Sequence, residues 1–150
     1  IEDLTNYPAY KLQVANTPAV ITCTDVMANE HPALVVTYMK AMIKVGRWAN
    51  EHKRAAAVLL DRQTFYRDAE DTYQGIKDVD MVPNLSPQNL ACVATGKDFM
   101  VRNGYIKNDF DVQKWAAPEF LEMAAKQLIE EQWKKKSGEK LPEGTQLRLG

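Results

Sequence analysis

The sequence contains little cysteine and no cysteine pattern that binds metal. Its 150 residues include only Cys23 and Cys92, which lie far apart and outside any Cys-x-x-Cys spacing. Zinc sites and redox-active pairs need thiolates close together in such motifs. We therefore expect no bound metal ion, no disulfide framework and no cofactor.

Long apolar runs and an excess of basic residues are also missing. No stretch approaches the roughly 18 consecutive apolar residues that a membrane-spanning helix needs. Lysine and arginine number 19 against 20 aspartate and glutamate, which gives a net charge of −1. A nucleic-acid-binding surface usually needs a clustered basic excess. These absences argue against a membrane-spanning segment and against nucleic acid as a partner.

The sequence lacks a signal-peptide pattern and begins at Ile1 rather than at methionine. Such a start is typical of a processed chain or a fragment, and a fragment is the expectation here. Hydrophobic residues make up 45% of the sequence. That share is enough for the packed core of one domain of this length.

Clear signals for extended structure lie near the beginning of the sequence. Residues 12–14 and 19–24 are rich in Val, Ile and Thr, and Pro18 between them indicates a break or a crossing point. Residues 81–82 are a weaker candidate. A single apolar strand needs a ladder partner for its backbone groups. Either the sheet is very small, or its other strands lie outside these residues.

The rest of the sequence is predicted to be helical. A long amphipathic helix begins at Pro32 and breaks near His52, and Gly46 inside it indicates a closely packed neighbour. Further helices are predicted over "KRAAAVLLDRQ", over "DAEDTYQGIKD", from the Ser86-Pro87 start to Asn103-Gly104, in a short turn after Asp111, and from Pro118 to about residue 136. We expect an α/β chain with one or two strands and five or six helices.

Two stretches carry a resemblance to a known family. "ANEHPALVVTYMKAMIKVGRWANEH" and "DVQKWAAPEFLEMA", most specifically Glu30–Trp48 and Trp115–Leu121, resemble the C-terminal portion of the substrate-binding proteins of ABC importers for nitrate, sulfonates, taurine and thiamine precursors. The chain is also similar to the hydroxybiphenyl sulfinate desulfinases, which share that fold and have a closely similar Trp-Ala-Ala-Pro-Glu-Phe-Leu stretch.

The resemblance implies a helix-rich part of a type II periplasmic-binding-protein-like fold. Residues 1–136 would be the C-terminal part of a two-lobe protein, with a hinge crossing at about 10–24 and a helical region at 32–136, followed by a polar tail at 137–150. The partners implied are the missing N-terminal part of the same protein, a small anion and the membrane subunits of an importer. A periplasmic or exported location follows by resemblance, and the apolar strand edge indicates possible self-association.

The function implied is binding of a small organic anion, such as a sulfonate, nitrate or taurine, for an ABC importer. The alternative is a desulfinase-like enzyme that hydrolyses a C–S bond. The catalytic cysteine, histidine and arginine of the desulfinases lie in the N-terminal part of that family. No catalytic residue is therefore expected in this chain.

Asn16 and Thr17 are the candidate ligand-binding residues. They sit beside Pro18 at the implied crossing between lobes, where an amide and a hydroxyl suit an oxyanion. The alternative is a hinge turn in which both side chains bind their own backbone.

Other candidate groups have simpler structural interpretations. Cys23 with His31 or His52 could form a nucleophile–base pair, but a buried strand cysteine and two surface histidines are favoured. Trp48 and Trp115 could stack on an aromatic ligand, although packing in the core is favoured, as it is for Phe120. A solvated face is favoured over a cation site for five acidic residues: Asp68, Glu70, Asp71, Asp78 and Asp80. Ordinary pairing on a helix surface likewise accounts for the lysines of "WKKKSGEK".

Overall fold

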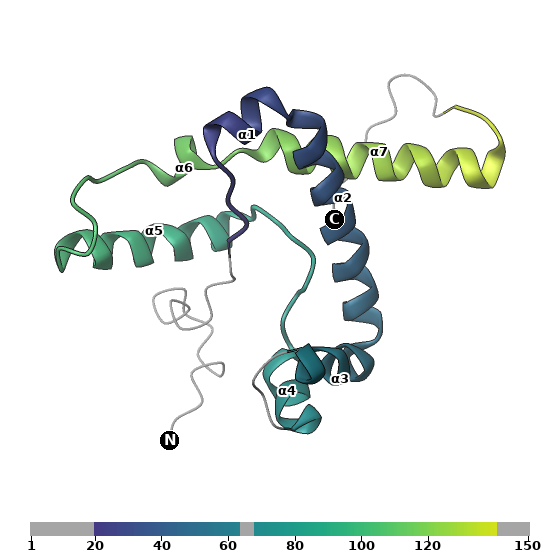
Figure 1. The fold of residues 1–150 in the computed structure, drawn as a ribbon, viewed down its shortest axis with the longest axis horizontal. Coiled ribbons are helices and arrows are strands. Elements are labelled where there is room, and N and C mark those ends of the chain that lie inside the picture. Colours follow the sequence, from purple (N-terminus) through teal and green to yellow (C-terminus); the bar gives the residue numbers. More distant parts are fainter. Residues whose placement is uncertain (1–19, 64–67, 141–150) are drawn as a thin grey trace. The chain divides into compact units, whose positions relative to one another are not determined.

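The computed structural model describes residues 20–63 and 68–140, which form seven α-helices (Figure 1). They are α1 (Asp25–Glu30), α2 (Pro32–Glu51), α3 (Lys53–Gln63), α4 (Ala69–Ile76), α5 (Pro87–Arg102), α6 (Val112–Trp115) and α7 (Pro118–Ser137). The described residues divide into two compact units. Unit 1 holds residues 20–26 and 84–118, and unit 2 holds residues 27–63, 68–83 and 119–140.

The predicted α/β class is wrong, because residues 20–63 and 68–140 contain helices and no strand. Residues 20–24 are exposed coil that leads directly into α1. A strand needs a neighbouring strand for its backbone hydrogen bonds, and the described part of the chain offers none. Residues 12–14 and 19, which completed the predicted extended region, lie outside the described residues.

The second candidate strand is a connector held by side chains. The Met81 amide donates to Asn50 Oδ1 at 3.0 Å, and the Val82 amide donates to Asp80 Oδ1 at 2.9 Å. Both amides are therefore satisfied without a ladder partner. This explains why a segment with extended propensity forms no strand.

The predicted helix ends are confirmed where local chemistry sets them. Proline occupies the first turn of α2 and α5, and Ser86 Oγ accepts from the Asn89 amide at 3.3 Å. The α5 helix ends at Asn103 and is followed by Gly104, which has a φ of +75°. Asp111 Oδ1 accepts from the Gln113 amide at 2.9 Å and so begins α6. The helix α1 was not predicted.

The core of unit 2 forms between α2 and α7. Val36 and Ile43 of α2 are buried against Ala124, Ala125 and Leu128 of α7. The two alanines add little side-chain volume to this cluster. Lys40 and Lys44 reach from α2 to Glu131 of α7 at the edge of this contact.

The sequence predicts that Trp48, Trp115 and Phe120 pack in the core. This prediction is wrong for the two tryptophans and only partly right for Phe120. Phe120 packs against the α2–α7 core but is only half-buried. Trp115 is 50% exposed at the end of the single turn of α6, and its ring lies 5.6 Å from that of Phe110 between centroids. Trp48 is 40% exposed, and its ring stacks on His52.

Gly46 confirms the predicted close approach of a neighbour. A Cβ atom at this position would lie 2.4 Å from the Met81 carbonyl oxygen and 2.9 Å from the Val82 Cα. Both obstacles are backbone atoms, which cannot rotate away. The connector of residues 79–83 therefore lies directly against α2 at the glycine.

None of the helices in the described ranges is long and apolar enough to cross a membrane.

Candidate functional site

The predicted ligand-binding residues, Asn16 and Thr17, lie outside the described residues. Their contact with a ligand stays a prediction.

The cysteine and the histidines occupy separate local settings. Cys23 is exposed in the coil before α1, which corrects its expected burial in a strand. His31 precedes α2 as its N-cap residue, without a side-chain capping bond. His52 follows α2, and its Nδ1 lies 3.0 Å from the Trp48 carbonyl oxygen. The contacts of His52 thus stabilise the end of a helix.

Asp68, Glu70 and Asp80, three of the five acidic residues weighed as a cation site, form hydrogen bonds within the chain. Asp68 Oδ1 accepts from the Glu70 amide and caps α4. Glu70 pairs with Arg54 of α3 at 2.8 Å, and the hydrogen bond from Arg54 lowers the pKa of Glu70. No group of three potential metal ligands occurs within residues 20–63 and 68–140.

Asp80 belongs to a polar cluster on the connector. Its carboxylate accepts from the Val82 amide and from Asn50 Nδ2, the latter at 2.7 Å. These two hydrogen bonds lower the pKa of Asp80, the backbone one most strongly. Lys53 also donates to the Val79 carbonyl oxygen. The cluster fastens the connector to α2 and α3.

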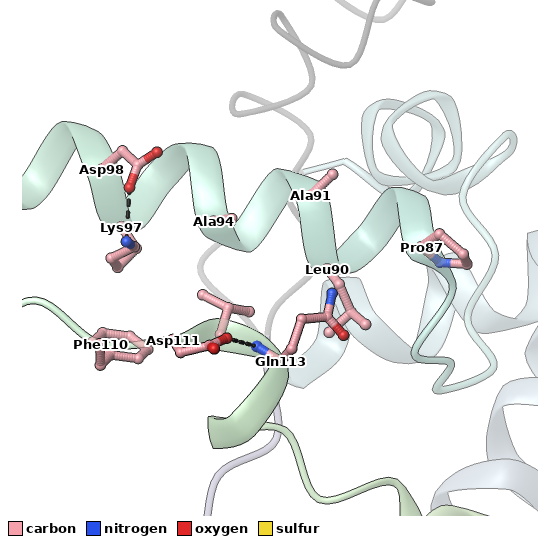
Figure 2. Close-up of a pocket in the computed structure, with 10 residues that line it drawn as sticks. Pro87, Leu90, Ala91, Ala94, Lys97, Asp98, Phe110, Asp111 and Gln113 are labelled. Atoms are coloured by element: carbon pink, nitrogen blue, oxygen red, sulfur yellow. Dashed lines mark hydrogen bonds and ion pairs between the residues drawn. The ribbon is translucent and has the colours of Figure 1, made fainter.

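An open pocket of about 310 Å³ lies in unit 1 between α5 and the segment that leads into α6 (Figure 2). The caps at Ser86 and Asp111 position its two walls. Its apolar lining is Pro87, Leu90, Ala91, Ala94, Phe110 and Val112, and its polar lining is Lys97, Asp98, Asp111 and Gln113.

The ammonium of Lys97 is the most constrained charge at this pocket. It lies 2.6 Å from Asp109 Oδ1 and 2.7 Å from Asp98 Oδ1, and 6.0 Å from the centre of the Phe110 ring. The hydrogen bonds that Lys97 donates to Asp109 and Asp98 raise the pKa of Lys97, and the bond that Asp109 accepts lowers the pKa of Asp109. The side chain of Lys97 is only 12% exposed.

The charge balance of the pocket disfavours a small anion. The lining holds one ammonium, that of Lys97, and two carboxylates, those of Asp98 and Asp111, and Lys97 is also paired with Asp109. An anionic ligand would compete with two carboxylates that already hold the ammonium. The pocket therefore suits the apolar part of a ligand better than an oxyanion.

Sequence reasoning did not identify this pocket. The local signals were present, since Ser86-Pro87 and Asp111 were recognised as starts of helical segments. The pairing of Lys97 with Asp109, twelve residues later, depends on how the chain turns back after Gly104. No periodicity in the sequence reports that turn.

The chain has a distant similarity to known enzymes. The chain is 26% identical over 113 residues to the 2′-hydroxybiphenyl-2-sulfinate desulfinases of Rhodococcus erythropolis and Rhodococcus qingshengii. The match covers 69% of this chain but 29% of each relative, so the chain spans less than a third of their length. No protein-family model and no solved structure matches.

Proposed function

We propose that this chain is the helical scaffold portion of a protein that acts on an organic sulfinate. The observation that carries the proposal is the similarity over 113 residues to the desulfinases. Their name gives the substrate class, an aromatic sulfinate, and the reaction, release of its sulfur group.

The placement of the resembling stretches supports a scaffold role. Glu30–Trp48 covers the end of α1 and most of α2, and Trp115–Leu121 leads into α7. Phe120 and Leu121 of the second stretch pack against the α2–α7 core. The resemblance thus falls on residues of α1, α2, α6 and the start of α7, and no catalytic group is expected among them.

The oxyanion contact is proposed for Asn16 and Thr17 rather than for the pocket in unit 1. The pocket has more carboxylates than ammonium groups, which is unfavourable for a sulfinate. An amide and a hydroxyl offer hydrogen bonds without that repulsion. Substituting Asn16 or Thr17 by alanine is therefore expected to weaken anion binding, while Asp98→Asn is expected to leave it unchanged.

The test is an assay for sulfite released from 2′-hydroxybiphenyl-2-sulfinate. We expect no release from the 150-residue chain alone, because the catalytic groups implied by the resemblance are outside it, and release from the complete gene product. Sulfite release by the 150-residue chain that disappears in Cys23→Ser would overturn the scaffold proposal and make Cys23 a nucleophile. Lack of release by the complete product would overturn the desulfinase proposal.

A second candidate is a substrate-binding protein of an ABC importer. It is supported by the resemblance of the same two stretches to that family, and it implies an exported protein that delivers a small anion to membrane subunits. Calorimetric titration of the complete gene product with taurine, nitrate and an aromatic sulfinate separates the two candidates. Micromolar binding of taurine or nitrate without sulfite release supports the importer role, and binding of the aromatic sulfinate with turnover opposes it.

A further inference from the structure

A regular apolar stripe follows the exposed side of α2. Its members recur at spacings of four, three, four and three residues. Apolar residues have this spacing along the contact between the helices of a coiled coil. We call it the outer stripe; it consists of Leu34, Tyr38, Ala41, Val45 and Trp48. The four large members are 57%, 53%, 58% and 40% exposed in sequence order.

The outer stripe is separate from the face of α2 that forms the core. Val36 and Ile43 lie on the other side of the helix and pack against α7. A helix that is apolar on two opposite sides is usually covered on both. Contiguous exposed apolar patches of this kind mark interaction surfaces.

We propose that the outer stripe pairs with the same stripe of a second copy of this chain, antiparallel and centred on Ala41. This register places Leu34 opposite Trp48 of the second copy and Tyr38 within one residue of Val45, an offset of about 1.5 Å along the helix axis. Each large aromatic side chain then meets an aliphatic one, and the two small Ala41 side chains meet at the centre. A parallel register would instead force Trp48 against Trp48 and Tyr38 against Tyr38.

The charges along α2 permit this pairing. The outer stripe contains no Asp, Glu, Lys, Arg or His, so the contact desolvates no charged side chain. The nearest lysine along one flank, Lys44, lies 3.7 Å from Glu131 of its own chain, and Lys40 binds the same carboxylate. These intrachain pairs reduce the repulsion between the lysines of two copies.

The size of the outer stripe predicts a dimer that depends on concentration. About half of the surface of its large side chains is exposed, so two stripes together cover on the order of 1,000 Å², where specific interfaces begin. Interfaces at this low end of the size range are typically weak and transient, so we expect a dimer of micromolar affinity. This inference does not rest on the proposed function.

The first experiment is sedimentation of the 150-residue chain between about 5 and 500 µM. We expect a monomer–dimer equilibrium that Val45→Glu weakens at least about tenfold, because each dimer would bury two added carboxylates. Val45 is 58% exposed, so the variant should keep its helical circular dichroism. The matched control is Met123→Glu on α7, where the side chain is 41% exposed and the dimer should persist.

The second experiment tests the register by disulfide formation. In a Cys23→Ser background, Ala41→Cys is expected to form a covalent dimer under mild oxidation, since Cα atoms within about 7 Å can be bridged. Lys126→Cys, exposed on α7, serves as the control and should stay monomeric. A chain that is monomeric at 500 µM, or a dimer that Met123→Glu disrupts and Val45→Glu does not, would overturn the proposal. If the chain is monomeric, the outer stripe binds something other than a second copy, such as a further part of the polypeptide.

Discussion

At the scale of single residues, Gly46 decides whether the connector can lie on α2. Gly46→Ala should lower the free energy of unfolding by about 1–3 kcal/mol, because the added methyl group meets backbone atoms that cannot yield. The matched control is Gly96→Ala in α5, where nothing lies within 4 Å of the added atom. That substitution should stabilise the chain by up to about 1 kcal/mol through helix propensity. Urea titration measures both, and equal effects would contradict the close approach.

Asp80 gives the connector a dependence on pH. The hydrogen bonds from the Val82 amide and Asn50 lower the folded-state pKa of Asp80. The stability that Asp80 contributes is therefore present above its unfolded pKa of about 3.9, and it is lost as the pH falls through the lower folded pKa. In Asp80→Asn, the free energy of unfolding should fall less steeply below about pH 4. Because Asp80 is exposed, the effect at neutral pH should stay below about 1 kcal/mol.

Asp78→Asn is the control for this pH experiment, since it removes a neighbouring charge in the turn after α4. Unfolding midpoints in urea between pH 2.5 and 7 should separate the two variants. Identical pH profiles would show that the hydrogen bonds of Asp80 do not matter for stability.

At the scale of secondary-structure elements, the cap of α5 also positions one wall of the pocket in unit 1. Ser86→Ala should cost about 1 kcal/mol, because the Asn89 amide loses its acceptor. Ser86→Asp, which offers an oxygen at the same place, should restore most of the loss. Thermal or urea unfolding checks this, and an equal loss for both variants would argue against a capping role.

The pairing of α2 with α7 depends on aliphatic rather than aromatic side chains. Leu128 is 2% exposed, so Leu128→Ala should cost about 2–5 kcal/mol. Phe120 is only half-buried, so Phe120→Ala should cost less than Leu128→Ala despite its larger side chain. A larger loss at Phe120 would restore the sequence-based expectation that it is a fully buried packing residue.

At the scale of the whole molecule, self-association should couple to stability. If two copies pair through the outer stripe, unfolding includes dissociation, and the thermal midpoint should rise with protein concentration. Val45→Glu should remove this dependence, whereas Met123→Glu should retain it. Scans at 5 and 200 µM measure the effect. The unpaired strand edge, from which the sequence predicts self-association, is not found in the described residues, which contain no strand.

The sequence by itself determined where most helices begin and end. Proline at a first turn, Ser86 and Asp111 as caps, and Gly104 after α5 act on neighbouring backbone groups, so their effect can be read locally. The close neighbour of Gly46 was predictable for a similar reason, because a glycine inside a helix has a cost that packing must explain.

Only the tertiary structure decided which apolar side chains are buried and where charges meet. The heptad spacing of α2 is visible in the sequence, but the burial of Ile43 and the exposure of Val45 follow from the side on which α7 packs. Two interactions join residues that are distant in sequence. They are the ion pair between Lys97 and Asp109 and the hydrogen bond from the Met81 amide to Asn50. Extended propensity near residue 20 and residue 81 produced no strand, because a strand is stabilised by a partner and propensity alone supplies none.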